Sequence, residues 1–463
     1  MPVTHFGAPC CAPRVIARAR WPRVISALAV AALAVTVSVP ATAQIAAPAP
    51  ALSLAAALRL AEDRSYALLA QDAAASAARE QAIAARQLPD PSLRLSTNNL
   101  PIEGANRFSV TSEPMTLRSV SVAQTFTRED KRLARSVRYG REAEAAQAMR
   151  AAQLAALRRN TALAWFDRHY QQQLVELLGR QRDEASLQIE AAEAAYRGGH
   201  GAQADVFLAR SDVARIEDRL REAHALVANT IQTLERWVGD QGAAPLGAAP
   251  TLMFTRFDDS ALEARIDRHP EIALMASKEA VAQAEAEVAR RARRADWTVD
   301  LTYSQRADTF GDVISIGVSI PLQWDQARRQ NRELAATLAR AEQARREREE
   351  ATLERVAEAQ RWRVTWRSNL TRLEDFDRTL IPLTAERTHA ALAGYRGGSV
   401  PLSGVLDARR MELDTRIERL RIEMQTAALW AQLEFLLLDE TLGTIPEART
   451  PMGEATNTVE IQQ

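Results

Sequence analysis

The sequence predicts a mostly α-helical chain in which a helix–strand–strand–helix unit occurs twice. The duplication appears in one motif: a long charged stretch ends at Ala195–Gly199, with the sequence AYRGG, and another ends at Gly394–Gly398, with the sequence GYRGG. A second pair of similar segments, Pro91–Leu95 and Trp297–Leu301, keeps nearly the same spacing. Only 5% of the residues are aromatic, and alanine, arginine and glutamate dominate both halves, as in long packed helices. A repeated unit usually cannot bury its apolar face alone, so we expect the two halves to pack together.

The first repeat, residues 44–240, contains three helical stretches and two strands. Apolar residues recur every three or four positions in the helical stretches and every second position in the strands. Pro89 and Pro91 end the first helix because proline cannot continue a helix interior. The second helix contains no proline and would span roughly 100 Å at 1.5 Å per residue; after it the chain reverses at Gly198 and Gly199. We expect helices over about 54–88, 128–196 and 202–237, and strands over about 92–97 and 119–126.

The second repeat, residues 260–440, follows a polar linker over 241–259 and has the same plan. Pro321 ends its last strand, and Pro382 is expected to kink its long helix. In each repeat the two shorter helices together match the long one, so we expect them to lie end to end beside it. The periodicity stops near the C-terminus, where we expect a disordered tail over 441–463. The remaining elements are a short helix near 260–268, helices over about 270–294, 326–395 and 402–438, and strands over about 297–305 and 312–320.

The N-terminus has the pattern of a secretory signal peptide, which we expect over 1–43. An apolar run over 24–39 is followed by small residues at Ala41–Ala43, and it is preceded by Arg14, Arg18, Arg20 and Arg23. A retained membrane anchor is the alternative, but the run is shorter than the roughly 20 residues that a spanning helix needs. Both cysteines, Cys10 and Cys11, lie in this segment. The exported chain would then have no disulfide, no thiolate metal site and no cysteine for a lipid anchor.

Charge and motif content argue against nucleic-acid binding and catalysis. The 59 basic and 59 acidic residues are interleaved along the helical stretches, so the formal net charge is zero and the charges are expected to be solvated helix faces. The histidines have no HExxH-type spacing, no glycine-rich phosphate loop is present, and the methionines are scattered. We therefore expect no enzymatic activity, no cofactor and no resident metal site.

The four predicted strands would not form a stable isolated sheet in water. Each has one apolar face, and the strands over 297–305 and 312–320 have the roughly nine residues that a tilted membrane-spanning strand needs. A sheet in lipid must close because lipid cannot hydrogen-bond its edges. Four strands cannot close a barrel, whereas three copies supply twelve, so the membrane interpretation requires a homotrimer. A small soluble sheet that caps a coiled-coil rod is the alternative. The residues expected to face lipid are Val299, Leu301, Tyr303, Ile314, Ile316, Val318 and Ile320.

The export signal, the duplicated plan and the glycine turns followed by Asp205-Val206 or Val405–Asp407 resemble the TolC-like outer-membrane efflux proteins. The resemblance covers essentially the whole chain after the signal peptide. It implies a trimeric twelve-stranded β-barrel in the outer membrane of a Gram-negative bacterium, continued by a long α-helical tunnel across the periplasm. It also implies a passive duct that serves an inner-membrane pump of the resistance-nodulation-division type through a periplasmic adaptor protein.

Several short segments are most similar to the branch of this family that works with heavy-metal pumps. They are Leu88–Pro91, Asn98–Pro101, Phe126 and Lys131–Arg132. A chain of this branch would conduct metal cations without binding them tightly. Drugs, other small molecules or a secreted polypeptide are alternative cargoes. A periplasmic coiled-coil scaffold or adaptor without a pore is the alternative from another class.

The resemblance places functional residues at the two glycine turns. Some relatives carry two aspartates three positions apart that ring the closed aperture, and here those positions are Gly404 and Asp407. One ring of three carboxylates would then remain in the trimer. Alternatively, Asp205 and Asp407 only cap or solvate the start of a helix, where the helix dipole favours negative charge. The periplasmic tip, where relatives meet the adaptor, would comprise Gly198, Gly199, Asp205, Val206, Gly397, Gly398, Val405 and Leu406.

Overall fold

The structure is a computed structural model that describes residues 51–255, 268–307 and 310–437. The chain divides into two units, Met1–Pro48 and Ala49–Gln463, and all described residues belong to the second unit. The signal peptide expected over 1–43, most of the short helix near 260–268 and the tail over 441–463 lie outside the described residues.

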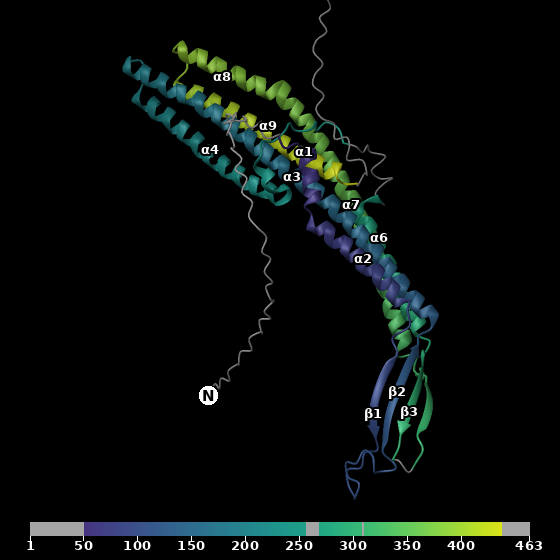
Figure 1. The fold of residues 1–463 in the computed structure, drawn as a ribbon. Coiled ribbons are helices and arrows are strands. Elements are labelled where there is room, and N and C mark those ends of the chain that lie inside the picture. The colour runs from purple at the N-terminus through teal and green to yellow at the C-terminus, as the bar shows by residue number, and fades with distance from the viewer. Residues whose placement is uncertain (1–50, 256–267, 308–309, 438–463) are drawn as a thin grey trace, which may run out of the picture. The chain divides into compact units, whose positions relative to one another are not determined.

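Helices predominate in the described chain, and each repeat contributes two strands to one sheet (Figure 1). Among the described residues, no helix combines the length and apolar character that crossing a bilayer requires. The first repeat contains α1 (Leu54–Asp63), α2 (Tyr66–Ala85), β1 (Ser92–Asn98), β2 (Leu117–Phe126), α3 (Glu129–Arg197), α4 (Gln203–Val238) and the 3-10 helix η1 (Gly239–Ala243). The second contains α6 (Pro270–Ala292), β3 (Trp297–Gln305), β4 (Val313–Ser319), α7 (Gln330–Asp375), the π-helical turn η3 (Phe376–Leu380), α8 (Ile381–Arg396) and α9 (Leu402–Glu434).

The first helix differs from the prediction, because the stretch expected as one helix over 54–88 is divided into α1 and α2. The Ser65 Oγ atom accepts a hydrogen bond from the backbone N–H of Leu68 (3.4 Å), and Ser53 accepts one from Ala56 in the same way (3.2 Å). A serine side chain thus satisfies an N–H group that a helix start leaves without a partner. The cap at Ser65 therefore begins a second helix inside the apolar pattern.

The long helix expected over 326–395 is also interrupted. α7 ends at Asp375, and α8 begins after the π turn with Pro382 in its first turn. Proline has no N–H to donate, and its ring crowds the preceding turn of a helix. The hydrogen-bond ladder shifts here, and the N–H of Ile381 donates to the carbonyl of Phe376, five residues earlier. The distortion predicted at Pro382 therefore lies in the turn just before it.

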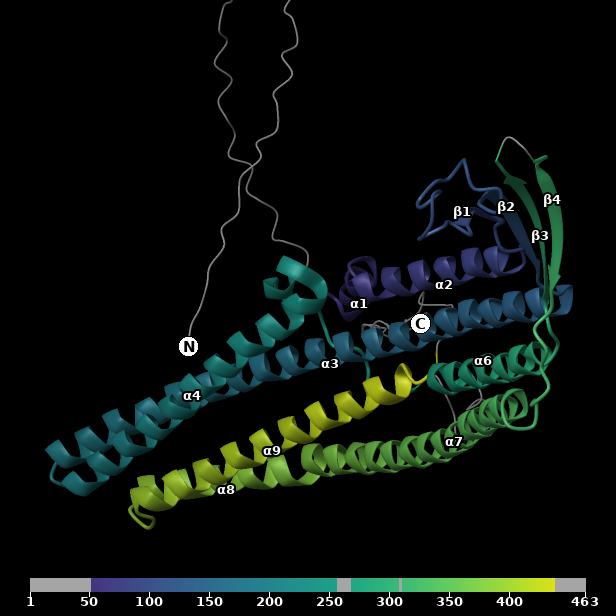
Figure 2. The same ribbon diagram turned by 90° about the horizontal axis from the view of Figure 1, so that it is seen from below.

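The two long helices organise the packing of the others. α1, α2 and α4 pack along α3, whereas α6 and α9 pack along α7, and α9 also packs on α8. The α3–α4 turn and the α8–α9 turn lie at the same end of the helices, opposite the sheet (Figures 1 and 2). α3 also contacts α6 and α9, so the two repeats lie side by side.

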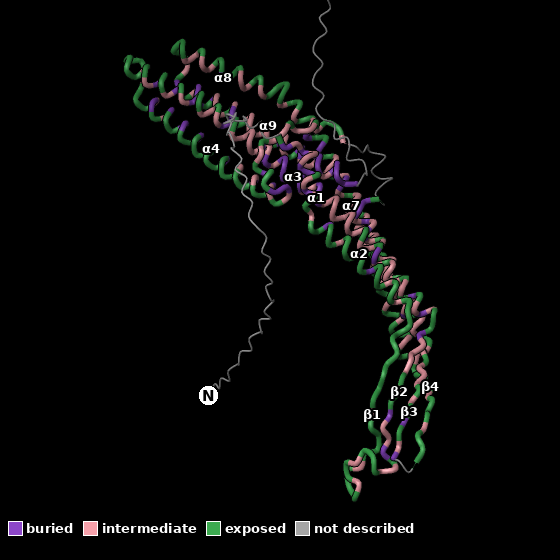
Figure 3. The backbone as a smooth tube through the Cα atoms, viewed as in Figure 1, coloured by how far each residue is buried: buried purple, intermediate pink, exposed green. Residues whose placement is uncertain are grey.

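The largest core joins the two repeats where α1, α3, α7 and α9 meet (Figure 3). Phe166 of α3 and Trp430 of α9 are buried and meet edge to face, with 5.8 Å between ring centroids. Two indole N–H groups donate to backbone carbonyls: Trp165 to Leu52 (3.0 Å) and Trp430 to Phe254 (2.8 Å). Because both repeats supply these aromatic rings, neither could bury them alone.

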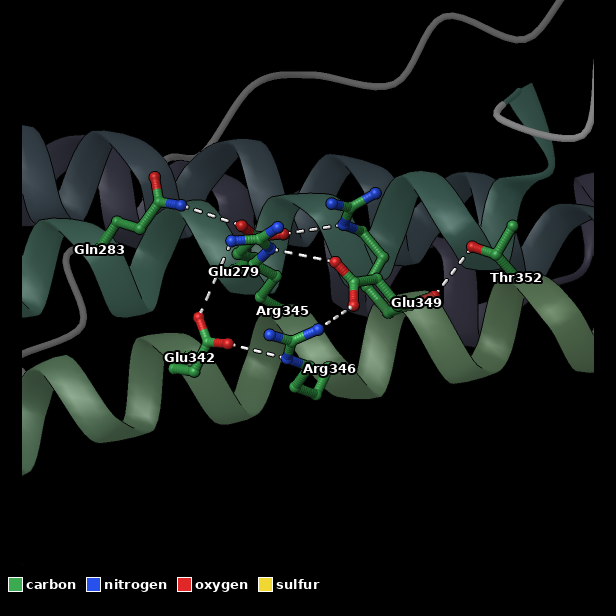
Figure 4. Close-up of polar contacts among 8 residues, drawn as sticks. Glu279, Gln283, Glu342, Arg345, Arg346, Glu349 and Thr352 are labelled. Carbon is green, nitrogen blue, oxygen red and sulfur yellow. Dashed lines mark hydrogen bonds and ion pairs between the residues drawn. The ribbon is translucent and has the colours of Figure 1, made fainter.

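Charged contacts, rather than burial, hold the first part of α7 (Figure 4). Arg346 pairs with Glu342 (2.8 Å) and Glu349 (2.9 Å), which lie one turn to either side. Arg348 crosses to Glu279 of α6 (2.7 Å). Pairs at this helical spacing each contribute about 0.2–0.5 kcal/mol, so several of them are needed to support an exposed helix.

Candidate membrane surface and helical tips

The apolar side chains of the four strands gather on one face of the antiparallel sheet. The pairing register places Leu93, Val122, Leu301 and Ile316 in one row across all four strands, and Leu95, Val120, Tyr303 and Ile314 in another. These side chains are between 44% and 74% exposed. Soluble proteins rarely leave a contiguous apolar patch of this kind uncovered. The face therefore needs an apolar environment or a partner.

All seven residues predicted to face lipid belong to this face or continue it. Val299 pairs with Val318 in a third row, and Ile320 directly follows β4 in the same alternation. The structure thus brings together on one surface the side chains that the alternating pattern selected, namely Val299, Leu301, Tyr303, Ile314, Ile316, Val318 and Ile320.

The opposite face of the sheet is polar and rich in hydroxyl groups. The Oγ atoms of Ser119 and Ser304 are 2.8 Å apart, and the Oγ1 atoms of Thr125 and Thr298 are 3.0 Å apart. Both pairs join β2 to β3, the strands of different repeats. A sheet with one apolar and one hydroxyl-rich face suits a closed barrel with lipid outside and water inside.

Both glycine turns end a helix in the same way. Gly199 has a φ of +74° and Gly398 a φ of +73°, in the left-handed region that glycine adopts at low cost. After α3, the N–H of Gly199 donates to Tyr196 (3.1 Å) and the N–H of His200 to Ala195 (3.0 Å), and the equivalent pair of bonds follows α8 (3.0 and 2.9 Å). This Schellman arrangement satisfies the last carbonyls of each helix. The repeated Tyr-Arg-Gly-Gly motif is therefore a helix-ending signal.

The residues beyond each turn do not all lie on the surface. Gly198, Gly199, Gly397 and Gly398 are exposed. In contrast, Val206, Val405 and Leu406, which we expected at the docking surface, are only 7%, 0% and 2% exposed. They pack together with Ala192 and Leu402 in a cluster that joins the two helical hairpins. Their side chains hold the tips together, which leaves the exposed turns as the candidate docking surface.

The two aspartates named in the sequence have different surroundings. The carboxylate of Asp205 accepts the backbone N–H of Ala202 (3.2 Å), so it caps α4. This is the structural role considered as the alternative for this residue. Asp407 lies in the second turn of α9, its side chain is 65% exposed, and its carboxylate is 3.5 Å from the guanidinium of Arg410. Of these two aspartates, only Asp407 keeps a largely exposed side chain without capping a helix.

Close packing accounts for the glycine at position 404. A Cβ atom added at Gly404 would lie 2.9 Å from Cγ1 of Val400, and one added at Gly394 would lie 2.6 Å from Cγ2 of the same side chain. Real Cβ contacts are not this short, so Val400 occupies the room that a larger residue would need. The sequence motif alone did not reveal this role of Val400.

A pair of charges that the sequence analysis did not identify connects the hairpins. Arg410 of α9 lies 2.8 Å from Asp212 of α4, whose side chain is only 12% exposed. The hydrogen bond with Asp212 raises the pKa of Arg410 above its ordinary value. No motif or helical spacing relates these two residues, because they lie 198 positions apart.

The segments that resemble the heavy-metal branch have structural roles at the junction between helices and strands. Lys131 is buried, and its Nζ atom lies 3.0 Å from Asp296, just before β3. Arg132 donates a hydrogen bond to the carbonyl of Arg86 beyond the end of α2 (2.7 Å). Among the described residues, no group of three or more His, Cys, Asp and Glu side chains is arranged to hold a metal ion.

Solved structures of other proteins resemble this chain over most of its length. The outer membrane protein VceC of Vibrio cholerae aligns with a TM-score of 0.68 over 82% of this chain and 94% of its own, at 19% identity. CusC, a protein that forms a transmembrane channel, aligns with a TM-score of 0.70 over 82% and 91%, at 16% identity. The CmeC outer membrane channel of Campylobacter jejuni aligns with a TM-score of 0.69 over 82% and 85%, at 13% identity.

This chain has the fold of outer-membrane channel proteins. The predicted fold class, a mostly helical duplicated chain with a membrane β-barrel, is thereby confirmed. No protein-family model and no curated protein matches the sequence. At identities below 20% the likeness concerns the fold, and the function has to be argued from the surfaces of this chain.

Proposed function

We propose that this protein is a TolC-like outer-membrane efflux channel, a passive exit duct of a Gram-negative bacterium. The observation that carries this proposal is the sheet, with complete rows of exposed apolar side chains on one face and hydroxyl groups on the other. Three copies would close twelve strands into a barrel with lipid outside. The helices would extend the passage through the periplasm.

The duct performs no covalent chemistry in this proposal. An inner-membrane pump of the resistance-nodulation-division type supplies the driving force, and a periplasmic adaptor connects it to the helical tips. The exposed turns at Gly198–Gly199 and Gly397–Gly398 are the docking surface for the adaptor. Asp407 lines the aperture, where three-fold symmetry would bring three carboxylates together. Opening separates the hairpins that Arg410 and Asp212 join in this structure.

For the cargo, we propose heavy-metal cations. The support is the similarity of the segments around Leu88–Pro91, Asn98–Pro101 and Lys131–Arg132 to the heavy-metal branch. A conduit does not need a tight metal site, since tight binding would slow release. Drugs and other small molecules are the competing cargo, and the same passage would conduct them.

Fractionation and conductance test the channel proposal. The full-length protein, produced in a Gram-negative host, should appear in outer-membrane fractions as a trimer that dissociates on heating, and it should form pores in planar lipid bilayers. A soluble periplasmic protein without conductance would instead favour the coiled-coil scaffold. This outcome would overturn the channel proposal.

Complementation tests the cargo. A host that lacks its own outer-membrane efflux channel would receive this protein together with a metal-exporting pump of the resistance-nodulation-division type and its adaptor. Restored tolerance to metal cations, with lower cellular metal content measured by mass spectrometry, is the expected result. Restored tolerance to drugs alone would overturn the metal proposal and leave the channel proposal in place.

A further inference from the structure

The apolar alternation of β4 continues past the end of the strand. The side chains at every second position from 314 to 324 are between 56% and 87% exposed, and they are Ile314, Ile316, Val318, Ile320, Leu322 and Trp324. Between the last two, Gln323 donates from Nε2 to the carbonyl of Ala292 at the end of α6 (3.3 Å). This bond holds the segment after β4 against the helix. Three exposed apolar side chains, Ile320, Leu322 and Trp324, therefore extend this surface beyond the end of β4.

Two tryptophans mark the helix-proximal end of this surface. Trp324 is 87% exposed, the largest exposed fraction among the large apolar side chains of the described residues. Trp297 begins β3, is 42% exposed, and stacks on Phe126 with 4.5 Å between ring centroids. Tryptophan and tyrosine are enriched at the boundary between hydrocarbon and headgroups, because their rings are apolar with one polar group.

Arginines without protein partners lie next to these tryptophans. Gln326 donates from Nε2 to the carbonyl of Arg293 (3.2 Å), which brings the turn after Trp324 to the end of α6. The guanidinium groups of Arg293, Arg328 and Arg329 are exposed and have no ion-pair or hydrogen-bond partner among the residues that the structure describes. Three unpaired guanidinium groups thus lie where the apolar surface ends.

We infer that Trp297, Trp324, Arg293, Arg328 and Arg329 form a membrane-interface anchor that binds anionic phospholipid headgroups on the helix side of the bilayer. The inference rests on the proposed function, because it requires the apolar rows to lie in lipid. The tryptophan rings lie at the hydrocarbon boundary, and the guanidinium groups reach the phosphates just outside it, as the order of the residues requires. Asp296 and Asp325 are acidic neighbours of this group in the sequence, but Asp296 already pairs with Lys131 (3.0 Å), so Asp325 lowers but does not cancel the positive charge of the three arginines.

The anchor would fix the depth of the barrel in the bilayer. A barrel whose apolar band ends at a row of tryptophans and arginines resists vertical displacement in either direction, since moving it would bury guanidinium groups or expose apolar side chains. A second copy of the chain could instead cover Trp324, because β4 is an edge strand of the sheet. The two arrangements differ in whether the Trp324 ring touches lipid, which can be measured.

Fluorescence quenching by brominated lipids tests the tryptophan contact. The purified trimer would be reconstituted in phosphatidylethanolamine and phosphatidylglycerol vesicles whose acyl chains carry bromine near the headgroup. We expect strong quenching in the parent protein and clearly less in Trp324→Phe. Trp366→Phe, which removes a buried tryptophan of α7, should leave the quenched component unchanged. Equal quenching in Trp324→Phe and the parent would overturn the anchor, because Trp324 would then lie outside lipid or under a second copy.

Lipid selectivity tests the arginines. The relative association of spin-labelled phosphatidylglycerol over phosphatidylcholine should fall at least twofold in the double variant Arg328→Gln, Arg329→Gln. Arg221→Gln, which changes an exposed arginine of α4, is the matched control and should have no effect. Unchanged selectivity in the double variant would overturn the inference. Conductance of the same samples separates the two proposals, since a parent protein that inserts and conducts supports the channel whichever way the lipid result falls.

Discussion

The guanidinium of Arg410 in α9 lies 2.8 Å from the carboxylate of Asp212 in α4, and this contact joins the last helix to the first helical hairpin. The same guanidinium is 3.5 Å from Asp407. One arginine therefore links the hairpins and also offsets the charge of the residue proposed to line the aperture. Any movement that separates the tips must break the contact between Arg410 and Asp212. It would then also change the electrostatic potential around Asp407.

Asp212→Asn should loosen the tips. The substitution removes a charge-assisted hydrogen bond, which contributes about 1.5–3 kcal/mol when it is shielded from water, and the lower end applies because Arg410 is partly exposed. We expect a larger or more frequently open conductance in planar bilayers without loss of the trimer. Asp218→Asn is the control, since Asp218 forms a largely exposed pair with Arg221 on the same helix. Identical traces for Asp212→Asn and the parent would show that this contact does not restrain the tips.

Ile316→Arg should prevent membrane assembly. Ile316 is 74% exposed and lies in the apolar row with Leu301. A charged side chain on the lipid face costs about 2–4 kcal/mol near the bilayer midplane, and a trimer carries three copies. Outer-membrane fractions should therefore lack the heat-modifiable trimer. Ser315→Arg, one position away on the hydroxyl-rich face, should assemble, and equal assembly of both variants would contradict the assignment of the lipid face.

The alternating strands and the glycine turns were the parts of the fold that the sequence could predict, because local patterns determine them. A strand can be recognised from apolar residues at every second position, and a turn can be recognised from a glycine that can adopt a positive φ. The cap at Ser65 was also a local signal, but the continuous apolar pattern concealed it. Trp324 continues the alternation beyond Pro321, and taking that proline as the end of the pattern excluded it.

Contacts between distant segments could not be predicted in this way. The burial of Val206, Val405 and Leu406 depends on how two hairpins from different repeats pack. The sequence around a hydrophobic residue beside a turn does not show whether that residue packs inside the protein or binds a partner. The same limit applies to Arg410 and Asp212, whose pairing needs the angle between α4 and α9. Such contacts follow from tertiary geometry. Because acidic and basic residues alternate along every helix, the sequence alone offers many possible ion-pair partners for each arginine.

Gly398→Val should impair efflux more than folding. The φ of +73° at this position is strained for any side chain and most of all for a β-branched one. The cost of roughly 1–2 kcal/mol falls at the exposed turn rather than in the core, so the trimer should survive while adaptor crosslinking and cargo tolerance decline. Gly179→Ala is the control, because Gly179 lies within α3, away from the turns, and a Cβ atom added there would meet nothing within 4 Å. Normal crosslinking in Gly398→Val would remove the turn from the docking surface.

Acid should weaken the start of α6. The Nδ1 atom of His269 accepts the backbone N–H of Glu271 (3.2 Å), which requires a neutral ring, and burial lowers the pKa of His269 to about 4. The unfolded chain binds this proton near its ordinary pKa of about 6.5. The contribution of the neutral His269 ring to the free energy of unfolding is therefore fully present above pH 6.5. This contribution is lost as the pH falls from about 6.5 to 4, by about 1.4 kcal/mol for each pKa unit. Thermal unfolding of His269→Asn, which retains a capping side chain, should depend less on pH over this window than that of the parent, and parallel pH profiles would contradict this role.

Asp407→Ala should reduce the preference of the pore for cations. If Asp407 faces the passage, the trimer places three carboxylates around its narrowest part, and Gly404 adds no second ring. Arg410, at 3.5 Å, offsets part of that charge. Arg410→Gln should therefore change selectivity in the opposite direction, and it should also give the larger conductance expected when the contact with Asp212 is lost. Reversal potentials in planar bilayers under a salt gradient measure both effects, and barrel assembly should be normal because both residues are far from the strands. If Asp407→Ala and Arg410→Gln both retain the parent reversal potential, Asp407 only solvates the start of α9, and the aperture lies elsewhere on the last two helices.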